Sequence, residues 1–102
     1  MRIYLSGSIT GTKDHEKRFQ QAEEEARKQF PEAEIINMAS VTRPLNRTAK
    51  SLEHKDYMAM SFLLLGKCDA IYMIPGWEQS RGANQEYGYA VAKGMQILGA
   101  EG

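Results

Sequence analysis

The residues with the clearest chemical potential lie in one segment, SRGANQE, from Ser80 to Glu86. We expect a helix to begin here. The first N–H groups of a helix lack partners within it, so Ser80, Arg81 and Gly82 form a candidate anion-binding site. Glu86 follows about one turn later. Its carboxylate could attack a sugar carbon and form a covalent glycosyl-enzyme, as in retaining glycosidases. The alternative is that Glu86 only complements the helix dipole.

A second glycine-containing segment, SGSITGTK, follows the first expected strand. Three residues separate Gly7 from Gly11, whereas a P-loop needs four, and no GxGxxG fingerprint is present. Magnesium-dependent NTP chemistry and dinucleotide binding are therefore not supported. The segment still suits close approach of the backbone to a sugar or phosphate, although a plain strand-to-helix turn is the simpler interpretation.

Other polar and aromatic residues give weaker signals. Tyr4 and Trp77 are candidates for stacking on a base or hydrogen bonding to it, but aromatic residues beside strands are more often part of the core. His15 and His54 lie on charged helical segments, where we expect them to be solvated. Cys68 adjoins an apolar strand and is expected only to pack there.

Strands and helices alternate along the chain, which predicts an α/β fold with a parallel sheet covered on both faces. In such sheets ligands bind beyond the carboxyl ends of the strands, which singles out the segments 6–11 and 75–82. We expect Thr12 to cap a charged helix with an apolar stripe, and Ser51 to cap a helix that is apolar on more than one side. The expected strands are Arg2–Ser6, Glu34–Met38, Asp69–Ile74 and Met95–Leu98; the expected helices are 12–30, 51–67 and 83–93; residues 39–50 are expected to form a loop.

Composition limits the classes of function. With 102 residues and no linker, the sequence predicts one domain spanning residues 1–102. Thirteen basic residues balance thirteen acidic ones, which argues against binding a nucleic acid polymer. One cysteine and two histidines make a metal site improbable, and no organic cofactor is implied. No apolar run approaches the length of a membrane span, so we expect a cytoplasmic protein that does not contact the membrane.

Three motifs together resemble the nucleoside 2-deoxyribosyltransferase-like superfamily. They are IYLSGSITG near the start, CDAIYMIPGW in the middle and SRGANQEYGYAVAKG near the end. Their order and spacing match those of the superfamily, and the resemblance extends over nearly the whole chain. Within that superfamily the chain is most similar to short phage and bacterial domains of unknown function, and next to 2′-deoxynucleoside 5′-monophosphate N-hydrolases. The resemblance implies a Rossmann-like or flavodoxin-like three-layer sandwich, with about four mostly parallel strands, that cleaves or exchanges an N-glycosidic bond.

The resemblance also implies roles for individual residues. Glu86 matches the nucleophile and Tyr4 the tyrosine that orients it. Gly7, Ser8 and Ile9 match the loop that lines the sugar site, and Ser80 and Gly82, beside Arg81, match the loop that holds a 5′-phosphate. Trp77 has no role implied by the resemblance and stays a candidate for contact with the base on its residue type alone. The family usually carries an aspartate where this chain has Ser61; that aspartate helps the base to depart, and Asp56 is a candidate substitute.

Three functions follow, in order of preference. The first is a nucleoside or nucleoside 5′-monophosphate N-glycosidase, with hydrolysis favoured over deoxyribosyl transfer and a covalent intermediate on Glu86. The second is a catalytically impaired domain that binds, senses or sequesters a nucleotide, which would fit Ser61. The third is an interaction module that uses the apolar segment 58–65. That segment also leads us to expect a homodimer or higher homo-oligomer.

Overall fold

The computed structural model describes residues 1–8, 15–41 and 51–99. Its sheet contains four strands, β1 (Arg2–Ser6), β2 (Glu34–Ile36), β3 (Ala70–Met73) and β4 (Gln96–Leu98). They lie in the order β2-β1-β3-β4, and all three pairings are parallel. This is the strand order with which flavodoxin-like sheets begin, so the expected α/β class and parallel sheet are confirmed.

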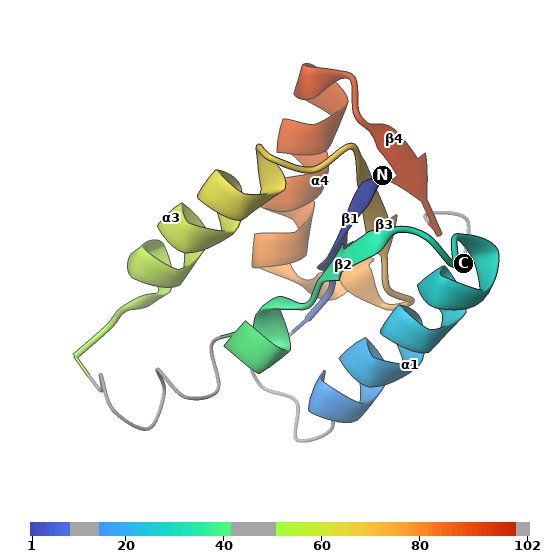
Figure 1. Cartoon of the computed structure of the whole chain (residues 1–102). Coiled ribbons are helices and arrows are strands. Elements are labelled where there is room, and N and C mark those ends of the chain that lie inside the picture. Colours follow the sequence, from blue (N-terminus) through green and yellow to red (C-terminus); the bar gives the residue numbers. More distant parts are fainter. Residues whose placement is uncertain (9–14, 42–50, 100–102) are drawn as a thin grey trace.

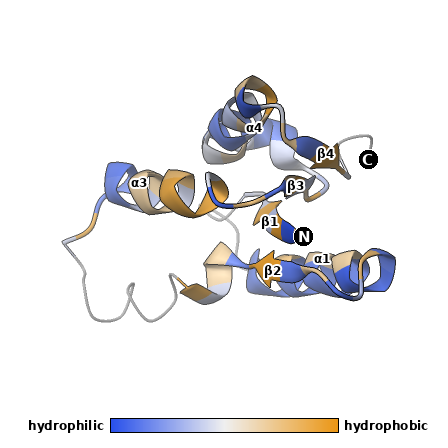
Figure 2. Ribbon diagram, turned by 45° about the horizontal axis from the view of Figure 1, so that its top comes forward, coloured by the Kyte–Doolittle hydropathy of each residue, from blue (hydrophilic) through white to orange (hydrophobic). Residues whose placement is uncertain are grey.

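Three long helices cover the sheet: α1 (His15–Gln29), α3 (His54–Leu65) and α4 (Arg81–Lys93). Figure 2 shows α1 on one side of the strands and α3 and α4 on the other, which makes three layers. Figure 1 shows the carboxyl end of β1 directed toward the start of α4. None of the described helices is long and apolar enough to cross a membrane.

Alternation along β1 explains how one short strand serves both layers, because successive side chains of a strand point to opposite faces. Leu5 packs with Phe19 of α1, whereas Tyr4 packs in the core beneath α3 and α4. Ser6 lies two residues after Tyr4 and faces the same layer, toward α4, since its hydroxyl reaches Glu86 there. The fold therefore directs two hydroxyl groups of β1 toward one helix.

Several expected boundaries differ from those observed. The second strand ends at Ile36 because the Asn37 backbone and side-chain oxygens accept the N–H of Ser40, starting a helical turn over residues 38–41. The loop expected from residue 39 is therefore helical up to 41. Ser51 does not cap α3. The N-cap is Glu53, whose backbone N–H donates to the side chain of Asp56 over 2.8 Å. Thr12, the expected cap of the first helix, lies outside the described residues.

The end of the chain follows expectation more closely. The helix α4 begins two residues earlier than expected, at Arg81, because Ser80 caps it: its Oγ accepts the N–H of Ala83 over 3.1 Å. Gly94 ends the helix with a positive φ of 73°, a conformation that glycine adopts without steric cost. A short 3-10 helix, η1 (Trp77–Gln79), lies between β3 and this cap.

Candidate active site

A cavity of about 410 Å³ opens beside the carboxyl end of β1, between α3 and the first turn of α4. Its volume falls in the range of roughly 300–1,000 Å³ that is usual for small-molecule sites. Most of the lining is apolar or aromatic, with a few hydroxyl groups and one carboxylate. The lining residues are Tyr4, Leu5, Gly7, Phe19, Met38, His54, Tyr57, Met58, Ser61, Ser80, Gly82, Ala83 and Glu86.

The carboxylate belongs to Glu86, which is only 5% exposed. Its Oε2 accepts the hydroxyl of Tyr4 and its Oε1 accepts that of Ser6, each over 2.6 Å. Both distances lie in the range of charge-assisted O–H···O⁻ bonds. Because both oxygens act as acceptors, this is the geometry of an ionised carboxylate held in one orientation.

Two opposing effects act on the acidity of Glu86. Burial raises its pKa above the ordinary value of a glutamate, and hydrogen bonds from Ser6, Tyr4 and Ser61 lower it, with burial the larger effect. The pKa of Tyr4 is raised as well, first by burial and then by the neighbouring negative charge of Glu86. Tyr4 therefore keeps its proton and remains a donor to the carboxylate.

Ser61 supplies the third hydroxyl of this cluster, from α3. It is 8% exposed and lines the cavity. Its hydroxyl lies close enough to Tyr4 and Glu86 to lower the pKa of both. Hydroxyl groups from β1 and α3 thus converge on a carboxylate from α4. We call Tyr4, Ser6 and Ser61 the hydroxyl cluster.

The start of α4 forms the polar end of the cavity. The side chain of Ser80 accepts the N–H of Ala83 over 3.1 Å, and its carbonyl accepts the N–H of Asn84 over 3.0 Å. The N–H groups of Arg81 and Gly82 have no such partner within the described part of the chain. They lie at the positive end of the helix dipole, so this turn can attract an anion.

The structure brings together most, but not all, of the residues expected from the sequence. Tyr4, Gly7, Ser80, Gly82 and Glu86 all line the cavity. The cavity lining does not include Ser8, Trp77 or Arg81. Trp77 packs on the ring of Tyr87 instead, with 4.9 Å between ring centroids. Ile9 lies outside the described residues.

Two interpretations from the sequence need correction. Glu86 is the sixth residue of α4, beyond its first turn, and is buried against strand hydroxyls, so it is no dipole partner. Asp56 is absent from the cavity lining, because its carboxylate accepts the N–H of Glu53 at the start of α3.

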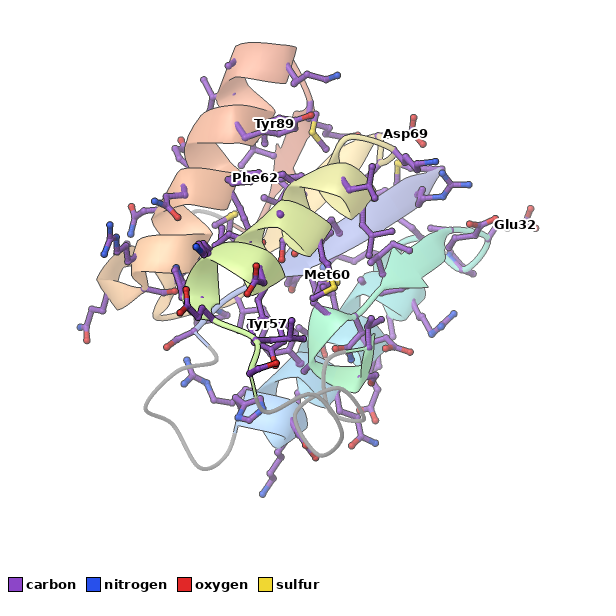
Figure 3. All side chains as sticks on the ribbon, turned by 90° about the vertical axis from the view of Figure 1, so that its left-hand side faces the viewer. Glu32, Tyr57, Met60, Phe62, Asp69 and Tyr89 are labelled. Atoms are coloured by element: carbon purple, nitrogen blue, oxygen red, sulfur yellow. The ribbon has the colours of Figure 1, made fainter. Side chains whose placement is uncertain are left out.

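Several residues that line the cavity were not expected from the sequence. Ser6 had a usable signal, because it follows Tyr4 by two residues on one strand and must share its face. His54 is exposed, as expected, and it also lines the cavity from the first turn of α3. Tyr57 lies one turn later (Figure 3), and Phe19 and Met38 come from distant elements without a local signal. Within the described ranges, no group of three His, Cys, Asp or Glu residues could hold a metal ion.

Comparison with known families assigns the chain to one family. A family model described as "Domain of unknown function (DUF4406)" matches residues 1–99, nearly the full length. The chain belongs to this DUF4406 family. A search of curated proteins gives no match. The DUF4406 match spans β1, α3 and α4, and therefore includes every element that contributes to the cluster around Glu86.

Proposed function

We propose that this DUF4406 protein is an N-glycosidase of nucleosides or nucleoside 5′-monophosphates, and that Glu86 is its nucleophile. The observation that carries the proposal is the buried carboxylate in a ligand-sized cavity, with both oxygens held by hydroxyl donors. No salt bridge joins Glu86 to a cationic side chain within the described ranges, and burying a glutamate in this way is costly if it serves stability alone. It is a common way to prepare a nucleophile or base.

The reaction we infer has two steps. A Glu86 oxygen attacks the anomeric carbon while the bond from that carbon to the base nitrogen breaks, and a glycosyl ester forms. Water then attacks the same carbon, loses a proton and restores the carboxylate. Tyr4 and Ser6 orient the carboxylate before attack and stabilise it again when it leaves. Hydrolysis is favoured over transfer to a second base.

The cavity fits the parts of such a substrate. The apolar and aromatic lining from Phe19, Met38 and Met58 suits the faces of a base. The first turn of α4, with Ser80 and Gly82, suits a 5′-phosphate, which helix N-termini bind readily. The motifs that resemble the nucleoside 2-deoxyribosyltransferase-like superfamily support the same assignment, and we propose that the DUF4406 chain is part of it. A nucleotide substrate and a single cysteine fit a cytoplasmic protein.

The test is release of free base, followed by liquid chromatography, from ribo- and deoxyribonucleosides and their 5′-monophosphates. Glu86→Gln keeps the size of the side chain and should lower the rate at least about a thousandfold, because it removes the nucleophile. Glu78→Gln makes the same chemical change at an exposed glutamate and should leave the rate unchanged. Full activity in Glu86→Gln would overturn the proposal.

Ser61 favours a second candidate, a domain that binds a nucleotide without cleaving it. A serine hydroxyl is too weak an acid to protonate a departing base, and general acids commonly contribute about a hundred- to ten-thousandfold in rate. Under this alternative, calorimetry should give equal nucleotide affinity for the wild type and Glu86→Gln, with no base released by either.

A further inference from the structure

Two of the three hydroxyl groups in the cluster already donate their protons to Glu86. A hydroxyl group has one O–H to donate. Tyr4 and Ser6 donate theirs to the two oxygens of Glu86 over 2.6 Å. Ser61 is the third hydroxyl of the cluster; it lies beside Tyr4 and Glu86 and lowers the pKa of both, and a serine hydroxyl is itself too weak an acid to protonate a departing base. The groups closest to the nucleophile therefore stabilise an anion and have no proton to spare for a leaving base.

The acidity of these groups points the same way. Burial and the neighbouring carboxylate raise the pKa of Tyr4, which makes it a weaker acid than a free tyrosine. The cavity also favours positive charge in a ligand. Glu86 is a buried anion, the rings of Tyr4, Phe19 and Tyr57 line the walls, and the described lining contains no lysine or arginine. Aromatic faces attract cations, most strongly where water is excluded.

We propose that the preferred substrates are nucleosides or nucleoside 5′-monophosphates in which the ring of the base that is bonded to the sugar carries a positive charge. N7-alkylated purines and pyridinium bases are examples. The inference rests on the proposed function. When Glu86 attacks, the carbon–nitrogen bond breaks and its electron pair stays on the nitrogen. A cationic base then leaves as a neutral molecule without needing a proton. A neutral base would have to leave as an anion, next to a carboxylate and in a largely apolar cavity.

The experiment compares 7-methylguanosine 5′-monophosphate with guanosine 5′-monophosphate, which differ by one methyl group and one positive charge. The corresponding nucleosides and 2′-deoxy forms complete the panel, and spontaneous release is subtracted for each substrate. We expect kcat/KM for the methylated member of a pair to exceed that of its partner by about a hundredfold or more, the range that a missing general acid leaves open. Similar values for both members would overturn the inference and leave the N-glycosidase intact.

Variants at position 61 test the physical cause. Ser61→Asp places a carboxyl group beside Glu86, where burial and like charge favour its protonated form. It should raise the rate of cleavage of the unmethylated substrate, and so lower the ratio of kcat/KM for the methylated over the unmethylated substrate about tenfold or more. Ser61→Asn introduces a side chain of nearly the same shape as aspartate but without an acidic proton, and should leave this kcat/KM ratio as large as in the wild type. An equally wide ratio in Ser61→Asp would contradict the explanation, provided that the variant is folded.

His54 also lines the cavity and can carry a proton on its imidazole ring, so it provides an independent control. If the hydroxyl cluster governs base departure, His54→Gln should change the rates of both members of a pair by the same factor. A selective loss on the unmethylated substrate would show that His54 donates the proton, and would overturn the inference. If no member of the panel is cleaved, the proposed function itself fails.

Discussion

Removing the hydroxyl of Tyr4 tests the charged hydrogen bond at the centre of the site. Tyr4→Phe keeps the ring, which is 1% exposed, and deletes the donor to Glu86 Oε2. A hydrogen bond to a charged group contributes about 1.5–3 kcal/mol to stability, whereas one between neutral groups contributes about 0.5–1.5 kcal/mol. We expect the substitution to cost about 1.5–3 kcal/mol in the wild type but only about 0.5–1.5 kcal/mol in a Glu86→Gln background.

The assay is a double-mutant cycle on the free energy of unfolding. Urea unfolding of the four variants at pH 7, followed by far-UV circular dichroism, gives each free energy, and unchanged m-values support the comparison. The expected coupling between Tyr4 and Glu86 is about 1 kcal/mol or more. An equal loss in both backgrounds, within about 0.3–0.5 kcal/mol, would show that Glu86 is not the ionised partner.

Acid provides a second check on the same bond. Burial raises the pKa of Glu86 above its ordinary value of 4.5, so protonation in the folded protein begins above that pH. Once Glu86 is neutral, its bond with Tyr4 loses the contribution from charge. The loss caused by Tyr4→Phe should therefore shrink as the pH falls from 7 toward 4. A loss that stays constant across this window would contradict the assigned charge.

Three further predictions concern stability, access and assembly. Because the pKa of Glu86 is raised in the folded protein, its contribution to stability is complete below pH 4.5 and is lost as the pH rises through the folded pKa. Thermal melts should therefore show the stability of Glu86→Gln increasing relative to the wild type between pH 4 and 8, by about 1.4 kcal/mol for each tenfold difference in proton affinity between the folded and unfolded chains. The opposite trend would refute the direction of the pKa shift. Gly82→Ala brings a Cβ within 3.3 Å of the Met58 sulfur at the cavity, whereas the Cβ of Gly88→Ala meets nothing within 4 Å. Both substitutions gain up to about 1 kcal/mol in helix propensity, but only Gly82→Ala should raise KM severalfold. Equal KM values for the two variants would contradict the placement of the substrate. Leu63 is 65% exposed on α3, whose second half is hydrophobic (Figure 2). Light scattering should give a homodimer or larger for the wild type and a smaller species for Leu63→Lys, while an 11.5 kDa wild type would refute assembly.

Local patterns were enough to predict the class of fold. The apolar stripe of Phe19, Ala22 and Ala26 marks α1, and these three residues are buried as expected. Ser80 and Gly94 mark the two ends of α4 through interactions with the adjacent helical backbone. Boundaries were less predictable where two caps compete. At the start of α3, Glu53 and not Ser51 is the N-cap, because the carboxylate of Asp56 accepts the N–H of Glu53.

The candidate site was only partly predictable, because its bonds join residues far apart in the chain. Glu86 stood out for its chemistry, and Tyr4 for the family resemblance. Their contact spans 82 positions, and that of Glu86 with Ser6 spans 80. Parallel pairing of β1 with β3 and packing of α4 over both strands bring these residues together. No local rule of spacing contains that information.

The sequence alone therefore determined the periodic elements, the parallel α/β sheet and the residue types capable of chemistry, since these depend on side-chain size, polarity and neighbours along the chain. Tertiary structure decided which of those residues act together. It buried Glu86, directed the hydroxyls of β1 and α3 at it, added His54 and Tyr57 to the cavity, and left Trp77 out of its lining. The physical reason is that acidity and orientation depend on burial and on hydrogen-bond partners, which exist only once α3, α4 and the sheet have packed.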